Sequence, residues 1–156
     1  MDFFTVQTLA FGVLYCFFVI AHDRRRILHF NVTENPTSAW VIQQLREAFP
    51  YDSAPRHLIF DRGANFNDEV VELIKNFGIE PKRTSFQSPW QNGVAERFVG
   101  SCRRDLLDHV IVINKHHLKR LVNGKRPEFL SITHNSGRVW LVIDGSYSAS
   151  RQILTL

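Results

Sequence analysis

Cysteine is scarce in this chain, and the short motifs that hold zinc or nucleotides are missing. The 156 residues include two cysteines, Cys16 and Cys102, without CxxC or cysteine/histidine spacing. This pattern argues against a zinc site or a disulfide framework, and it favours two buried thiols in a reducing compartment. The seven histidines form no HxxxH or Ser/His/Asp pattern. Because the sequence has no GxGxxG or GxxxxGK(S/T) loop, we expect no nucleotide cofactor.

Apolar and aromatic residues, by contrast, are plentiful. They make up 44% and 12% of the chain, which is too hydrophobic for a disordered protein, and 156 residues can bury a sizeable core. We therefore predict one globular domain over residues 1–122. Residues 123–156 form a divergent tail of unknown role, in which polar turns surround one predicted hairpin.

Positive charge is concentrated in one segment. The chain has a formal net charge of +4, whereas residues 97–126 hold eight basic and two acidic residues, a net charge of +6 that leaves −2 for the rest. Such a segment suits a partner with a phosphate backbone, and binding to it should weaken as salt rises. The alternative is an ordinary solvated helix face.

The order of apolar runs and turn signals predicts an α/β fold. Runs of β-branched and aromatic residues predict three strands in succession, with Gly12 at the turn between the first two. A helix then runs to Pro50, and a second helix is capped by Asn67 and ended by Gly78. The predicted strands are 2–8, 13–21, 26–33, 57–61 and about 82–86, and the predicted helices are about 38–49, 68–77 and 93–109.

Three acidic residues stand at notable places in this pattern. Asp2 opens the first strand, Asp61 ends the fourth, and Glu96 begins the third helix. In open α/β sheets, ligands collect at the carboxyl ends of strands. Carboxylates are the hard oxygen donors that suit Mg²⁺, and two such ions about 3.5–4 Å apart support an in-line phosphoryl displacement. For Glu96 alone, the alternative is an ordinary solvent-facing glutamate beside Arg103 or Arg104.

Four stretches resemble the catalytic core of the retroviral-type integrase superfamily, specifically the DDE transposases and integrases of bacterial insertion sequences. They are DFFTV, VIAHDRRRILHFNVTENPTSAW, DRGANF and SPWQNGVAERFVGSCRRDLLDHVIV, and the resemblance covers roughly residues 1–122. The 34 residues between Asp61 and Glu96 are one fewer than the family's usual spacing. The resemblance implies an RNase-H-like fold, a mixed five-stranded sheet with helices on both faces.

The resemblance also implies a chemistry and a set of site residues. Asp2, Asp61 and Glu96 would be catalytic and would hold two Mg²⁺ or Mn²⁺ ions. The reaction would join DNA 3′-hydroxyl ends to target DNA. The loop before Glu96 and the basic segment imply the DNA-contacting residues Trp90, Gln91, Asn92, Arg97, Arg103, Arg104, Lys119 and Arg120.

The family further implies partners and a location. The partners would be the element ends and target DNA, together with a homo-oligomer or a full-length transposase. The protein would work in the bacterial cytoplasm, at the nucleoid. Relatives continue upstream of the first aspartate, usually into a helix-turn-helix domain, and close with a pattern that residues 123–156 lack. We therefore expect a truncated copy, and we leave the activity of this single chain open.

Two alternatives come from other classes of protein. One is a non-catalytic DNA-binding or dimerising fragment of a transposase, which would not depend on Mg²⁺ or Mn²⁺. The other is a small basic membrane-anchored protein, because residues 3–21 are apolar for long enough to span a bilayer and arginines follow at 24–26. A cleavable signal peptide is not predicted, since no basic segment precedes the apolar stretch.

Overall fold

The computed structural model describes residues 1–21, 26–50, 53–85 and 92–124. The hairpin predicted in the tail lies outside these residues. In chain order the strands and helices are β1 (Asp2–Gln7), β2 (Val13–Ile20), β3 (Ile27–Thr33), α1 (Ser38–Ala48), β4 (His57–Phe60), α2 (Asp68–Asn76), β5 (Glu80–Arg83), α3 (Gly93–Asp105), a 3-10 turn η2 (Leu107–His109) and α4 (Lys115–Gly124).

The first three strands form an antiparallel meander, as their sequence predicts. In the register of β1 and β2, Asp2 lies opposite Phe18 and Gln7 lies opposite Val13. The pairing of β2 with β3 is also antiparallel, and its register shifts between Val19 and Ile20. The hairpin between β1 and β2 carries Phe11, which has a φ of 60° and is 94% exposed.

The other two described strands form a separate parallel pair. The backbone of β4 pairs with β5 from His57↔Glu80 to Phe60↔Arg83, and α2 makes the crossover between them. The described strands therefore form one sheet of three and one of two, whereas a single sheet of five was expected. Within the part of the chain that the structure describes, one hydrogen bond links the two sheets, from the Met1 nitrogen to the Ile59 carbonyl at 2.7 Å. A single bond of this kind does not make a continuous ladder of strand pairing. We call the junction between Met1 and Ile59 the β1–β4 seam.

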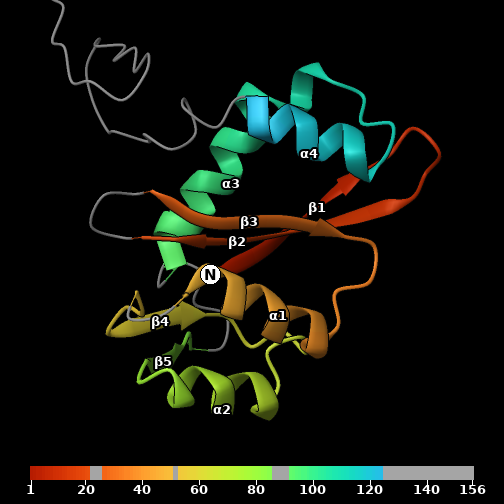
Figure 1. Cartoon of the computed structure of the whole chain (residues 1–156). Coiled ribbons are helices and arrows are strands. Elements are labelled where there is room, and N and C mark those ends of the chain that lie inside the picture. Colours follow the sequence, from red (N-terminus) through yellow and green to blue (C-terminus); the bar gives the residue numbers. More distant parts are fainter. Residues whose placement is uncertain (22–25, 51–52, 86–91, 125–156) are drawn as a thin grey trace, which may run out of the picture.

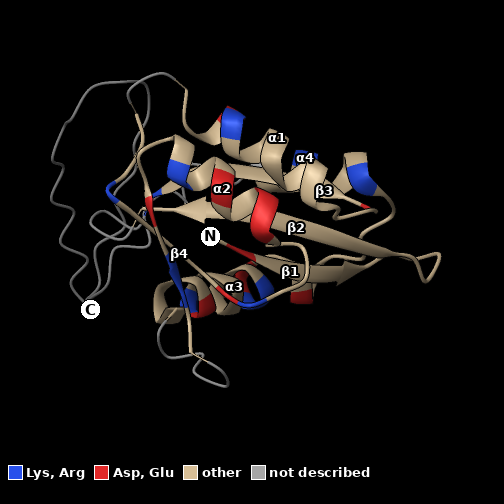
Figure 2. Ribbon diagram, turned by 90° about the horizontal axis from the view of Figure 1, so that it is seen from below, with Lys and Arg blue, Asp and Glu red and all other residues tan. Residues whose placement is uncertain are grey.

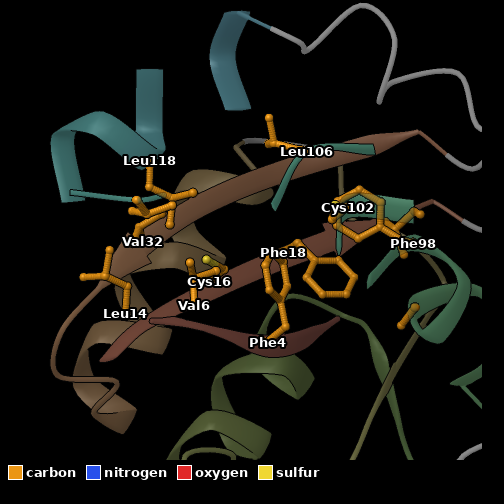
Figure 3. Packing of buried hydrophobic residues seen from close by; sticks show 13 residues of the cluster. Phe4, Val6, Leu14, Cys16, Phe18, Val32, Phe98, Cys102, Leu106 and Leu118 are labelled. Carbon is orange, nitrogen blue, oxygen red and sulfur yellow. The ribbon is translucent and has the colours of Figure 1, made fainter. Parts of the chain in front are cut away.

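Strand β2 is buried on both of its faces. Cys16 and Phe18 belong to a core cluster that includes residues of α3 and α4 (Figures 1 and 3). Phe17 and Val19 belong to a second cluster with residues of α1, β4 and α2. Figure 1 shows the resulting layers, with α3 and α4 on one side of the meander and α1, β4, β5 and α2 on the other. Alternate side chains of one strand thus join both halves of the core.

Local signals account for the start of α1 and for both ends of α2. The Thr37 hydroxyl accepts a hydrogen bond from the Trp40 backbone N–H, and the Asn67 side chain accepts one from that of Val70, each at 3.2 Å. Gly78 follows α2 with a φ of 74°, a conformation that favours glycine. The helix predicted over 93–109 instead ends at Asp105. Leu106 leaves the helical conformation and packs into the core, and η2 follows it.

The apolar stretch at the start of the chain forms strands and a hairpin. Residues 3–20 lie in β1, β2 and the turn between them, so their aromatic and β-branched side chains fill a sheet. Among the residues that the structure describes, no helix has the length and apolar character needed to cross a bilayer. The bilayer-spanning helix on which the membrane-anchored alternative rests is therefore not formed here.

Burial of β2 on both faces predicts that neighbouring side chains are equally costly to truncate. Because Phe17 and Phe18 are fully buried in different clusters, Phe17→Ala and Phe18→Ala should each lower the free energy of unfolding by about 3–5 kcal/mol. Phe11→Ala is the matched control, and the exposure of Phe11 limits its expected effect to about 0.5 kcal/mol. Urea denaturation measures all three. A mild effect at either Phe17 or Phe18 would contradict burial on both faces.

Candidate active site

The β1–β4 seam brings the first two predicted carboxylates to one part of the molecule. Asp2 is the first residue of β1, and Asp61 directly follows the last residue of β4. The bond between the Met1 nitrogen and the Ile59 carbonyl fixes the start of β1 beside β4. Both carboxylates are partly buried.

The side chain of Asp2 is held at both oxygens. Its Oδ1 accepts a hydrogen bond from the Phe3 backbone N–H at 2.7 Å, and its Oδ2 accepts one from Asn92 Nδ2 at 3.1 Å. The pKa of Asp2 is raised to about 6, mainly by burial and in smaller part by the negative charges of Asp61 and Glu96, against the opposing effects of the Phe3 N–H and the terminal amine. Both predicted partners therefore act electrostatically on Asp2.

Asp61 is fixed by the tight turn that follows it. Its Oδ1 accepts a hydrogen bond from the Gly63 backbone N–H at 2.9 Å. A Cβ atom at position 63 would lie 3.0 Å from the same oxygen, so glycine leaves the space that this carboxylate needs. Nearby, Arg62 Nε donates to the Thr84 carbonyl at 3.1 Å and Arg83 Nη2 donates to the Phe66 carbonyl at 2.7 Å. These two bonds tie the end of β4 to the chain around it.

Glu96 lies in the first turn of α3 and is exposed. Its helix is anchored through Ala95, Phe98 and Cys102, which are buried in the core. Over the described ranges 1–21, 26–50, 53–85 and 92–124, no three histidine, cysteine, aspartate or glutamate side chains form a ready-made metal-binding group. The role of Asp2, Asp61 and Glu96 as metal ligands therefore stays a prediction.

The predicted DNA-contacting residues have different surroundings. Trp90 and Gln91 lie outside the described residues. Asn92 is only 3% exposed, and it bonds to Asp2. The remaining five lie on α3 and α4, where Figure 2 colours the lysine and arginine positions blue. All are exposed except the partly buried Lys119: Arg97, Arg103, Arg104, Lys119 and Arg120. Burial and the charge of Lys115 lower the pKa of Lys119.

Two contacts in this region were not predicted from the sequence. The close approach of Gly63 to Asp61 and the bond from Asn92 to Asp2 both appear only in the structure. For Asn92 a signal was present, because it precedes Glu96 by four residues and such residues share a helix face.

Comparison with known proteins supports the resemblance drawn from the motifs. No protein-family model matches the chain. A putative transposase InsD of insertion element IS2E from Escherichia coli K12 is 31% identical over 91 residues, which cover 53% of this chain and 42% of that protein. The transposase InsD of IS2A/D/F/H/I/K from Escherichia coli has the same identity, with 30% of its length covered. The chain thus spans less than half the length of these relatives.

Solved structures show the same relationship at the level of the fold. The structure of a simian T-cell lymphotropic virus intasome with the PP2A regulatory subunit B56 gamma contains a chain that matches with a TM-score of 0.65 and 13% identity, covering 95% of this chain and 58% of that one. The HTLV-2 integrase catalytic core domain in complex with magnesium, in a dimeric form, matches with a TM-score of 0.51 and 15% identity, covering 80% and 79%.

These matches establish the fold class of the chain. The chain has the RNase-H-like α/β fold of retroviral integrase catalytic cores. Within that class, its similarity in sequence is to the InsD transposases of IS2 elements, which confirms the resemblance to an integrase or transposase core.

The raised pKa of Asp2 predicts a pH-dependent loss of stability. The folded state favours the protonated carboxyl of Asp2. The stability that this protonated group contributes is therefore full below its ordinary pKa of 3.8 and is lost as the pH rises through about 6. Relative to Asp2→Asn, the wild type should lose at most about 3 kcal/mol of unfolding free energy over this interval. Urea denaturation at a series of pH values measures the difference. Asp108→Asn, at an exposed residue, is the control, and a difference for Asp2→Asn that does not change with pH would contradict the prediction.

The contact between Gly63 and Asp61 predicts a coupling between two substitutions. Gly63→Ala should destabilise the protein by about 1 kcal/mol, because the new methyl group crowds the Asp61 carboxylate. In an Asp61→Ala background the same change should stabilise by about 0.5 kcal/mol, since alanine restricts the unfolded chain. Unfolding free energies of the four proteins give the coupling energy. Equal effects in the two backgrounds would show that the contact has no energetic consequence.

Proposed function

We propose that residues 1–122 form the catalytic core of a DNA transposase or integrase. In this role Asp2, Asp61 and Glu96 hold two Mg²⁺ or Mn²⁺ ions and support the joining of DNA 3′-hydroxyl ends to target DNA. The observation that carries the proposal is a pair of contacts that join the three elements: the Met1 nitrogen bonds to the Ile59 carbonyl beside Asp61, and Asn92 at the start of α3 bonds to Asp2. The charges of Asp61, which follows β4, and of Glu96 in α3 both act on Asp2 at the start of β1, within a fold shared with integrase cores.

The donor set fits a hard divalent cation. All three groups are carboxylates, and repulsion among them is the kind of strain that a bound cation relieves. When bound, a pair of such ions activates the attacking oxygen and stabilises the leaving oxygen. The chain's own part is to hold the carboxylates: the Phe3 N–H and Asn92 orient Asp2, and the Gly63 N–H orients Asp61. Glu96 is exposed, so its side chain has room to reorient.

DNA is the proposed partner. The exposed arginines of α3 and α4 supply positive charge on the helix that carries Glu96 and on the helix that follows it. This placement suits contacts to a phosphate backbone, which make affinity fall as salt rises. The HTLV-2 core is a dimeric form and the simian virus chain belongs to an intasome, and these examples support an oligomer here too. The proposed core includes one five-stranded sheet in which β4 follows β1 across the seam. The proposed activity on DNA would be carried out at the nucleoid, in the bacterial cytoplasm.

A non-catalytic DNA-binding or dimerising fragment is the second candidate. The observation in its favour is that the described residues offer exposed arginines on α3 and α4 without a ready-made group of three metal ligands. Such a fragment would bind DNA equally well with and without a divalent cation. Metal dependence therefore distinguishes the two candidates.

Strand transfer of a pre-cut oligonucleotide with a free 3′-hydroxyl into plasmid DNA, in the presence of Mn²⁺, tests the proposed function. Asp61→Asn and Glu96→Gln should each abolish transfer, because each removes a charged ligand. Both variants should keep salt-sensitive DNA binding, since they leave the arginines of α3 and α4 in place. Gel-based transfer assays and filter binding measure the two properties on the same samples.

Glu69→Gln provides the matched control for Glu96→Gln. Glu69 is also an exposed glutamate in the first turn of a helix, but that helix is α2. This variant should transfer strands as the wild type does. A parallel loss of transfer and DNA binding in Glu96→Gln would contradict the assigned role. Absence of transfer by folded wild-type protein that still binds DNA would support the non-catalytic candidate.

A further inference from the structure

Asn92 connects the start of α3 with Asp2 at the start of β1. It is the residue immediately before α3, and its Nδ2 donates a hydrogen bond to Asp2 Oδ2 at 3.1 Å. Its side chain is buried, with 3% of the residue exposed. A residue at the start of one helix therefore holds the carboxylate at the start of β1, which lies 90 positions earlier in the chain.

Helix capping does not explain this asparagine. An asparagine at such a position usually accepts a hydrogen bond from a backbone N–H in the first turn, and Asn67 does this for α2 by accepting from Val70. Asn92 makes no side-chain cap bond to α3. Its buried Oδ1 has no hydrogen-bond partner within the described part of the chain. An amide oxygen buried in this way costs free energy, so local stability alone does not favour asparagine here.

The geometry accounts for the residue in another way. Asn92 and Glu96 are four positions apart at the start of α3, so they lie on the same side of that helix. The bond to Asp2 thus fixes the part of α3 that carries Glu96 relative to the first carboxylate. The amide has two functional ends, of which Nδ2 is engaged by Asp2 while Oδ1 is free to accept from a water molecule.

We propose that Asn92 is a positioning residue for the carboxylates that bind the divalent cation. Through Nδ2 it holds Asp2 at a set place relative to Glu96, and through Oδ1 it accepts a hydrogen bond from a water of the hydrated cation. Mg²⁺ and Mn²⁺ sites of this kind retain several waters, so such an acceptor has a ligand to serve. This inference rests on the proposed function, because it presupposes that the carboxylates bind a cation.

Direct measurement of Mn²⁺ binding without DNA tests the inference. The free ion is counted by electron paramagnetic resonance during titration of the wild type, Asn92→Leu and Asn92→Gln. Asn92→Leu keeps the size and removes both polar ends, and it should raise the Kd for Mn²⁺ by about 10- to 100-fold, as loss of a residue that orients a ligand does. Asn92→Gln keeps the amide and should recover most of the affinity. Asn67→Ala removes a helix cap and should lower Tm without changing the Kd.

A second measurement uses the wild-type protein and needs no variant that folds poorly. The side-chain amide of Asn92 in ¹⁵N-labelled protein, assigned by its loss in Asn92→Gln, should shift when Mg²⁺ is added, whereas that of Asn67 should not. A folded Asn92→Leu protein with wild-type affinity, or an Asn92 amide that ignores Mg²⁺ binding, would overturn the inference and leave the proposed function standing. If the wild type binds no Mn²⁺, the proposed function fails and the inference fails with it.

Discussion

The architecture depends on the burial of β2 on both faces. Phe18 and Cys16 pack under α3 and α4, while Phe17 and Val19 pack against the layer that contains α1 and β4. This double burial sets the height of α3 above the meander and the position of β4 below it. The three carboxylates lie in β1, directly after β4 and in α3. Their relative positions therefore follow from how the two layers pack on β2.

Much of the fold was predictable because its signals are local. The meander and the cap of the second helix depend on residues a few positions apart, such as Asn67 with Val70, and the structure confirms them. The division of the described strands into two sheets was not predictable, because it depends on how far β1 and β4 pair, and the Met1 to Ile59 bond between them spans 58 positions. The end of α3 was also misplaced, since Leu106 leaves the helix in order to pack into a distant part of the core.

The candidate site also has features that local sequence signals predicted and others that depend on distant contacts. The motifs selected Asp2, Asp61 and Glu96, and the structure shows that the last two act on the first, although metal binding by the three stays a prediction. The contacts that orient these carboxylates were not predicted from the sequence. The space beside Asp61 depends on the path of the turn to Gly63, and the direction of the Asn92 side chain depends on a strand far away in sequence. A motif identifies acidic residues, whereas the groups that orient them are selected by three-dimensional packing.

The two buried cysteines have a consequence for measuring how firmly α3 packs on the sheet. Cys16 of β2 and Cys102 of α3 are buried in the same cluster, and burial raises the pKa of both thiols, that of Cys102 to about 12. Since the thiolate is the reactive form, neither sulfur should react with a maleimide while α3 rests on the sheet. Labelling would then require a local opening that separates this helix from the sheet, and it would proceed at the opening rate only where the reagent reacts faster than the contact recloses. The rate of thiol labelling at Cys16 and Cys102 therefore reports on detachment of the helix that bears Glu96.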